Sequence, residues 1–199
     1  MRTVILARHA ESRFSVTGTC NGDPASCEGL TDEGREQARA LGRLLADDPL
    51  ELCATTEFRR TQETADLALE GREVPRLVVP ELNDIRFGSY EGALLTEYRS
   101  WAHAAAPDDA CPGGGESRAE AAGRFARGFR VLLERNEDVV LAVAHALPIR
   151  YVLSALLEQD PAAVVEPVAY AEPSRFTAGQ LERAVLRLAR WSERPAWAA

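Results

Sequence analysis

His9 is the first residue of this sequence whose type and setting could do chemistry. It lies in the tetrapeptide Arg8-His9-Ala10-Glu11, directly after an apolar run at residues 3–7. A neutral imidazole is a nucleophile, and an arginine offers a planar fork of donors that fits phosphate oxygens. Cationic neighbours also oppose protonation of the imidazole. The tetrapeptide therefore fits a nucleophile beside an anion site, although a half-buried histidine with an incidental ion pair fits it equally well.

Two further segments carry basic or imidazole groups at expected strand ends. Residues 55–65 contain Arg59 and Arg60 where a strand gives way to a helix, and backbone N–H groups at a helix start favour anions. Taken alone, this pattern would favour arginines on a solvated helix. His145 ends the apolar run at residues 139–144, where the alternative is a core histidine with satisfied hydrogen bonds.

Acidic side chains precede a glycine-containing turn at residues 81–92. Asp84 and Glu81 are the two groups in this segment that could serve as a general acid. By itself the segment indicates only a loop.

In their order along the chain, these segments resemble the motifs of the histidine phosphatase superfamily, also called the phosphoglycerate mutase-like family. The resemblance covers residues 3 to about 153, and it selects Arg60 rather than Arg59 as the phosphate ligand. Each motif is weak alone, whereas the ordered series is specific. The matching segments are Arg8-His9-Ala10-Glu11, residues 30–38, Arg60-Thr61-Gln62-Glu63-Thr64-Ala65, residues 82–92, Gly114-Gly115-Glu116-Ser117 and Val143-Ala144-His145.

The resemblance implies a role for each of these residues. His9 would attack phosphorus and become a phosphohistidine, while Arg8, Arg60 and His145 would neutralise the phosphoryl oxygens. Asp84 would act as general acid and then general base, with Glu81 as the fallback. No metal or cofactor is implied, because arginine and histidine supply the positive charge. Further substrate-binding candidates are Ser15, Asn21 and Gly22.

Four positions depart from the family pattern. Ala10 and Ala146 stand where glycine commonly follows each histidine, Asp84 stands where many members have glutamate, and Ser15 stands where asparagine is frequent. These departures keep the chemistry plausible and put the rate and the substrate in doubt.

Strands and helices alternate along the chain, which predicts an α/β fold with three layers and a mostly parallel central sheet flanked by helices. In such sheets, sites form where strands end, as at His9 and His145. The expected strands are 3–8, 50–54, 76–79, 139–144 and 164–171. The expected helices begin after Thr31 and span 58–69, 94–105, about 119–133, 147–157 and about 181–191, with loops at 11–29 and 107–115.

Length and composition suit one domain over residues 1–199, with a less regular, substrate-covering segment around 86–115. The net charge of −8 argues against binding to nucleic acid or anionic membranes. No apolar stretch is long enough for a signal peptide or a membrane span, so a cytoplasmic location is expected. The four cysteines are expected to be free thiols there, although Cys20 and Cys27 are near enough in sequence to pair if oxidised.

The predicted function is a phosphomonoesterase that hydrolyses a small phosphorylated molecule through a phosphohistidine. The alternatives are phosphoryl transfer of the phosphoglycerate mutase type and a non-catalytic phosphate-binding module. Residues 164–171 could pair across a homodimer or lie inside the sheet. Specificity is expected in the segments 12–28 and 86–115, through Arg13, Arg86, Tyr90, Tyr98 and Trp101.

Overall fold

A computed structural model describes residues 2–26 and 28–198. Five strands form one sheet in the order β3-β2-β4-β1-β5, in which β1, β4, β2 and β3 run parallel and β5 is antiparallel to β1. This confirms the predicted α/β fold with a mostly parallel sheet. The strands are β1 Thr3–Arg8, β2 Leu52–Thr55, β3 Arg76–Val78, β4 Val139–Ala144 and β5 Pro173–Thr177.

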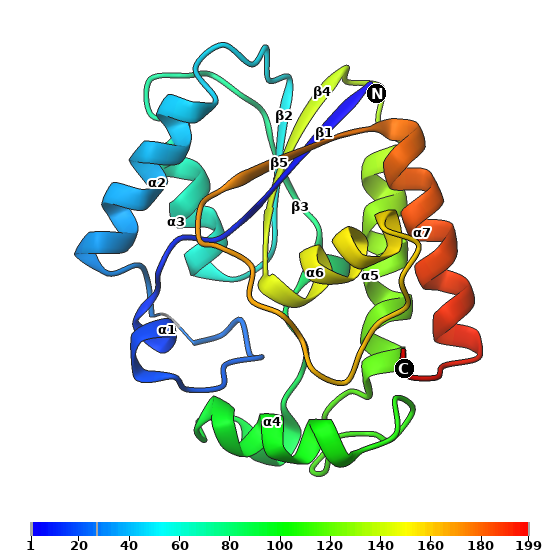
Figure 1. The fold of residues 1–199 in the computed structure, drawn as a ribbon. Coiled ribbons are helices and arrows are strands. Elements are labelled where there is room, and N and C mark those ends of the chain that lie inside the picture. Colours follow the sequence, from blue (N-terminus) through cyan, green and yellow to red (C-terminus); the bar gives the residue numbers. More distant parts are fainter. Residues whose placement is uncertain (1, 27, 199) are drawn as a thin grey trace.

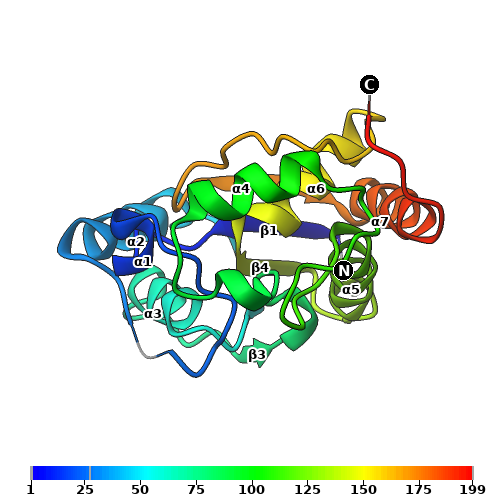
Figure 2. The same ribbon diagram turned by 90° about the horizontal axis from the view of Figure 1, so that it is seen from below.

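Helices cover both faces of this sheet, and further helices lie beyond the carboxyl ends of its strands (Figures 1 and 2). One face packs against α2 and α3, and the other against α5, α6 and α7. The helices are α1 Arg13–Thr17, α2 Asp32–Leu44, α3 Arg59–Ala68, α4 Leu95–Ala104, α5 Arg118–Leu133, α6 Ala146–Leu156 and α7 Ala178–Glu193. Two 3₁₀ turns, η1 Pro80–Leu82 and η2 Gly88–Tyr90, lie between β3 and α4.

The pleat of the central strands explains the two-sided core. Along β1, Val4 and Leu6 belong to the apolar cluster on the α5 side, while Ile5 and Ala7 belong to the cluster on the α2 side. Successive side chains of a strand point to opposite faces, so a continuous apolar run is what a strand covered on both sides needs. The same holds for β4, which lies between β1 and β2.

Most predicted elements are present within a few residues of their expected limits, and two predictions were wrong. Residues 164–171 form no strand; only Tyr170 makes an isolated bridge to Arg8, and β5 begins two residues later than this segment ends. Pro167 lacks a backbone donor, and Val164 is exposed. Residues 11–29 are not wholly loop, because α1 is capped reciprocally by Ser12 and Ser15.

The irregular stretch at residues 157–172 is called the strap below. It links α6 to β5 and passes across the carboxyl ends of the central strands (Figure 1). Because residues 164–171 form no strand, they supply neither of the two expected arrangements, the pairing across a homodimer or the strand inside the sheet.

The described cysteines Cys20, Cys53 and Cys111 are free and buried; the alternative of a pairing between Cys20 and Cys27 involves Cys27, which lies outside the described residues. No helix of the described ranges has the length and apolarity that crossing a membrane requires.

Candidate active site

Three strand ends meet at the edge of the sheet where α1 and α4 lie (Figure 1). β1 ends at Arg8 and is followed by His9, β4 is followed by His145, and β2 is followed by Thr56. Because β1, β4 and β2 are parallel neighbours, their carboxyl ends bring these residues together. The two imidazole rings lie edge to face with their centroids 5.4 Å apart.

His9 is held as a neutral imidazole. Its Nδ1 lies 2.7 Å from the carbonyl oxygen of Ala10. A carbonyl only accepts, so Nδ1 carries the proton and Nε2 keeps its lone pair. Burial lowers the pKa of His9 well below its ordinary value, and the positive charges of Arg60 and Arg8 lower it further. Cationic neighbours therefore oppose protonation of His9, as predicted, but burial makes the larger contribution to its lowered pKa.

The second histidine is held in one tautomer by a chain of hydroxyl groups. The Thr61 hydroxyl donates to the carbonyl of Phe58 at 2.8 Å, so its oxygen is free to accept from Thr56 at 2.9 Å. The Thr56 oxygen in turn accepts from Nε2–H of His145 at 3.0 Å. Nδ1 of His145 is then unprotonated and lies 3.3 Å from a donor nitrogen of Arg60.

His145 is fully buried at the start of α6, and its surroundings favour the neutral ring. Burial, followed by the charges of Arg60, His9 and Arg8, lowers its pKa well below the ordinary value. The Phe58 ring packs edge to face against the imidazole, with the two ring centroids 4.8 Å apart.

Arg60 connects the two sides of the site. It donates from Nη1 to the side-chain oxygen of Asn21, from Nη2 to the Asn21 carbonyl at 3.2 Å, and from Nη2 to Asp84 Oδ2 at 3.2 Å. Only 5% of Arg60 is exposed, and its guanidinium stacks 4.2 Å from the Phe58 ring centroid. The predicted residue Asn21 thus orients Arg60.

Arg8 is held by the strap. Its Nη1 donates to the carbonyl of Val168 at 2.7 Å, and its guanidinium carbon lies 3.8 Å from the centre of the Tyr170 ring. Ala171 donates its backbone N–H to the carbonyl of Arg8 at 3.0 Å. Arg150 anchors the strap by donating to the carbonyls of residues 166 and 167 at 3.2 and 2.6 Å. Nε of Arg8 is buried without a partner among the described residues.

Asp84 lies on a short loop whose backbone is held by the side chain of Arg124. Arg124 donates to the backbone carbonyls of Glu81, Asn83 and Asp84 at 3.0, 2.8 and 3.0 Å. It also pairs with Glu116 at 2.6 Å. Burial acts to raise the pKa of Glu116, but hydrogen bonds and charge from Arg124 outweigh it, so the pKa is lowered. The Gly-Gly-Glu-Ser motif therefore holds the loop that carries the candidate acid.

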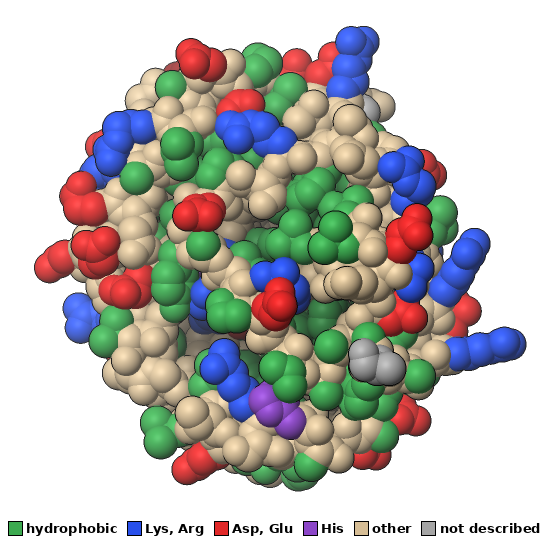
Figure 3. Space-filling model, in the orientation of Figure 1, with side chains coloured by type: hydrophobic (Ala, Val, Ile, Leu, Met, Phe, Trp, Pro, Cys, Tyr) green, Lys and Arg blue, Asp and Glu red, His purple; other side chains and the backbone are tan. Residues whose placement is uncertain are grey.

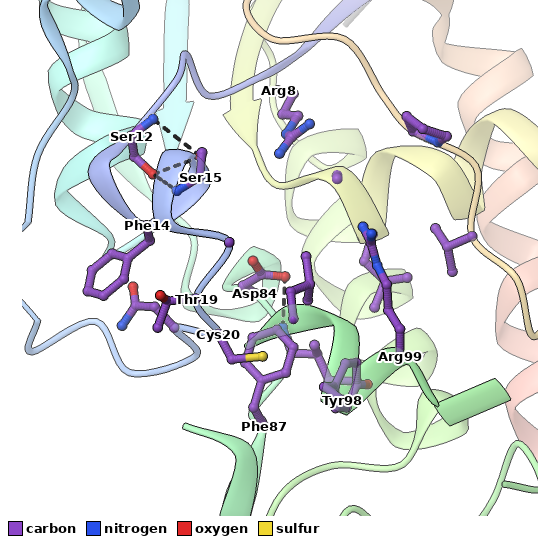
Figure 4. A pocket seen from close by; sticks show the side chains of 18 of the residues that line it. Arg8, Ser12, Phe14, Ser15, Thr19, Cys20, Asp84, Phe87, Tyr98 and Arg99 are labelled. Carbon is purple, nitrogen blue, oxygen red and sulfur yellow. Dashed lines mark hydrogen bonds between the residues drawn. The ribbon is translucent and has the colours of Figure 1, made fainter. Parts of the chain in front are cut away.

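These residues surround one cavity of about 410 Å³ (Figures 3 and 4). Figure 3 shows the hollowed face with basic side chains in and beside the hollow. Figure 4 shows Asp84 between Arg8 on one side and Phe87 on the other. Of the predicted site residues, those on the cavity wall are Arg8, His9, Ser15, Asn21, Arg60 and Asp84.

Several predicted residues lie elsewhere. His145 sits directly behind the wall in contact with Arg60 and Asp84, at 3.5 Å from Asp84 Oδ2. Gly22 is not among the described lining residues; it packs against the carbonyl of Ile85, where a side chain would collide. Glu81, the fallback acid, is also outside the lining. Ser15 lines the cavity, but its hydroxyl bonds Ser12 in the α1 cap.

Both segments in which specificity was predicted contribute to the cavity wall, but few of the side chains named there do. Of the five side chains expected to touch the leaving group, only Tyr98 lines the cavity. The residues that sequence reasoning missed come from α1, α4, the start of α5 and the strap. One feature of the sequence could have indicated Arg118: it lies in the first turn of a predicted helix, where a positive charge is disfavoured by the helix dipole. The missed lining residues include Phe14, Arg99, Arg118, Val165 and Tyr170.

Comparisons with known proteins agree with this geometry. Residues 4–190 match the family model described as histidine phosphatase superfamily, branch 1. An acid phosphatase of Mycobacterium tuberculosis is 36% identical over 155 residues, which are 71% of this chain and 69% of that protein. An adenosylcobalamin/alpha-ribazole phosphatase of Salmonella typhimurium is 40% identical over 86 residues, or 43% of this chain.

That second match spans only 42% of the relative's length. A structural match extends further: a putative alpha-ribazole-5'-P phosphatase of Escherichia coli superposes with a TM-score of 0.75 at 26% identity, covering 88% of this chain and 89% of that chain. Fold and family are therefore shared over nearly the whole sequence.

Proposed function

Because this chain belongs to branch 1 of the histidine phosphatase superfamily, we propose that it hydrolyses phosphate monoesters through a phosphohistidine formed on His9. The observation that carries the proposal is the hydrogen bond from His9 Nδ1 to the Ala10 carbonyl, which leaves Nε2 unprotonated. Phosphatases among the relatives support hydrolysis of a small phosphorylated substrate.

The first step transfers the phosphoryl group to the enzyme. The lone pair of His9 Nε2 forms a bond to phosphorus while the bond from phosphorus to the leaving oxygen breaks. The carboxyl group of Asp84 gives its proton to that oxygen. Arg8 and Arg60, which both line the cavity, stabilise the negative charge that builds on the phosphoryl oxygens.

His145 completes this charge balance. In the free site, Arg60 and Arg8 oppose its protonation. A bound phosphate dianion offsets those two charges, so that Nδ1 takes a proton from solvent as the substrate binds, donates it in a hydrogen bond to a phosphoryl oxygen, and returns it to solvent when inorganic phosphate leaves. Nε2 remains bonded to Thr56 throughout.

The second step returns the enzyme to its starting state. The Asp84 carboxylate takes a proton from water as the water oxygen attacks phosphorus, and the phosphorus–nitrogen bond breaks. Inorganic phosphate then leaves, and His9 is again neutral with its proton on Nδ1.

The experiment that tests this function is hydrolysis of p-nitrophenyl phosphate in EDTA by three proteins: the intact chain, His9→Ala and His103→Ala. His103 is an exposed histidine on α4 and serves as the matched control. We expect turnover in the intact chain and in His103→Ala, and a loss of at least about a hundredfold in His9→Ala. An acid-labile phosphoenzyme should be trapped by rapid quenching only when His9 is present.

Equal turnover in the intact chain and in His9→Ala would overturn the mechanism. Phosphate binding with no hydrolysis of any ester would indicate a binding module. Transfer of the trapped phosphoryl group to a phosphorylated acceptor rather than to water would indicate a mutase.

A further inference from the structure

Arg118 is a buried cation for which the described residues supply no counter-ion. It is 6% exposed, and none of the described residues forms an ion pair with it. Its Nη1 donates to the Tyr151 hydroxyl at 3.3 Å, and its Nε is buried without any hydrogen-bond partner among the described residues. An arginine stays ionised in proteins, so a full positive charge is held here.

The position is unfavourable for a positive charge on two counts. A buried charge is costly unless an opposite charge or good hydrogen bonds compensate it. Arg118 is also the first residue of α5, where the helix dipole is positive. Arg124, one and a half turns further along the same helix, shows the ordinary solution, since it is paired with Glu116 at 2.6 Å. An anion from outside the protein would compensate Arg118.

The charge faces the active-site cavity together with a second unsatisfied group. Arg118, Tyr98 and Arg99 all line the cavity. The Tyr98 hydroxyl is buried and has no hydrogen-bond partner among the described residues, and burial raises its pKa to about 12. It therefore keeps its proton and can donate to an anion. Figure 4 shows Arg99 and Tyr98 rising from α4 on the side of Asp84 away from Ser12 and Ser15.

Much of the remaining cavity wall is apolar, although Thr19, Thr96 and Glu166 also line it. Phe14 and Phe87 contribute aromatic rings, and Ile85, Leu95 and Leu147 contribute aliphatic surface. A leaving group in this cavity therefore meets several apolar side chains. Pockets of this size with a few placed polar groups are typical of small-molecule sites.

We propose that the preferred substrate is a phosphate monoester whose leaving group has an aromatic or apolar body and carries a carboxylate, which pairs with Arg118. The flat guanidinium fork matches a carboxylate, and the Tyr98 hydroxyl and Arg99 supply further donors. The inference rests on the proposed function, because the phosphate end must lie against His9.

Two esters of nearly equal shape test the pairing: 4-carboxyphenyl phosphate and 4-carbamoylphenyl phosphate. Their kcat/KM ratio is measured for the intact chain, Arg118→Met, Arg118→Lys and Arg130→Met. Arg130 is an exposed arginine on the same helix and controls for the loss of one charge. Comparing ratios between proteins cancels the difference in leaving-group acidity between the two esters.

We expect the carboxylate preference in the intact chain and in Arg130→Met to exceed that in Arg118→Met by roughly tenfold to a hundredfold, mainly through KM. Arg118→Lys should keep part of it. As a readout without turnover, 4-hydroxybenzoate should inhibit the intact chain more strongly than 4-hydroxybenzamide, and Arg118→Met should lose the difference.

An unchanged ratio in Arg118→Met would overturn the inference while leaving the phosphatase function in place. Failure of both esters and of p-nitrophenyl phosphate to react would instead count against the proposed function. The same ratio can be measured for an aliphatic pair, 3-phosphoglycerate and glycerol 3-phosphate. If the carboxylate preference is larger for this pair than for the aryl pair, the proposed aromatic or apolar body of the leaving group is wrong, whereas the proposed carboxylate is supported.

Discussion

At the scale of single residues, the site depends on where two imidazole protons are held. His9 donates a hydrogen bond from Nδ1–H to the backbone carbonyl of Ala10, whereas His145 donates from Nε2–H to the Thr56 hydroxyl. The nitrogens left without a proton are therefore Nε2 of His9 and Nδ1 of His145, and the latter lies 3.3 Å from a donor nitrogen of Arg60. Backbone and threonine oxygens thus decide which nitrogen can attack and which can receive a proton.

Thr56→Val tests this assignment, because valine keeps the shape and removes the acceptor for His145. We expect kcat to fall about tenfold, with a smaller change in KM, since the interaction is needed most when His145 becomes charged. The acidic limb of the kcat profile should also shift. Thr56→Ser restores the hydroxyl and should restore the profile; if it does not, the hydroxyl chain has no part in positioning His145.

At the scale of elements, two irregular segments are fixed from outside by arginines. The strap is anchored by Arg150 and holds Arg8, and the loop with Asp84 is anchored by Arg124. Each arginine donates to backbone carbonyls, which fixes a segment that has no regular hydrogen bonding of its own. These irregular parts of the cavity wall are thereby attached to α6 and α5.

Arg150→Ala should loosen the strap without touching the cavity. We expect KM for a phosphate ester to rise several-fold, because Arg8 loses the ordered carbonyl and ring of residues 168 and 170. Hydrogen exchange should show faster exchange at the Ala171 amide, which bonds the Arg8 carbonyl. Arg183→Ala, an exposed change on α7, is the control; equal exchange in both variants would contradict the anchoring role.

Arg124→Met should destabilise the whole protein as well as the loop. Glu116 is 3% exposed, and losing its partner leaves a buried charge, which costs on the order of 3 kcal/mol in the free energy of unfolding. Denaturant unfolding measures this cost. Arg124→Met with Glu116→Met should recover part of the stability but not the activity, because Asp84 stays unanchored. Full recovery of activity would show that Arg124 does not position Asp84.

Sequence patterns predicted regular elements well and the strap poorly, for a physical reason. Strands β1 and β4 are apolar runs whose burial follows from composition, and α2 and α5 carry capping residues and apolar stripes. The strap has similar apolar content, but it is ordered by contacts with Arg8 and Arg150, which are distant in sequence. Motifs likewise identified His9, Arg60 and His145, whereas Arg118 depends on what surrounds it in space.

At the scale of the whole molecule, two buried neutral histidines link stability to pH. The pKa values of His9 and His145 are lowered in the folded state, mainly by burial. In the unfolded chain both titrate near 6.5, so the unfolded state binds more protons once the pH falls below that value. Stability is therefore fully present above about pH 6.5 and decreases as the pH falls toward the folded-state pKa values.

The expected slope is roughly 1 kcal/mol per pH unit for each histidine. Urea unfolding at pH 7.5 and pH 5.0 measures it for the intact chain, His145→Asn and His103→Asn. The loss on acidification should be smaller in His145→Asn than in the other two. If all three lose the same free energy, burial of His145 does not control the acid stability of the fold.

The order of strands in the sheet has a consequence for how the protein is made. The strand β1 is made well before its neighbours, which are β4 at residues 139–144 and β5 at residues 173–177. The Arg8 side chain likewise donates to the carbonyl of Val168 in the strap. The apolar strand β1 therefore stays unpaired until both neighbours have been synthesised, a state that chaperones bind and that slows folding. His9 is thus translated long before the segments that complete its surroundings.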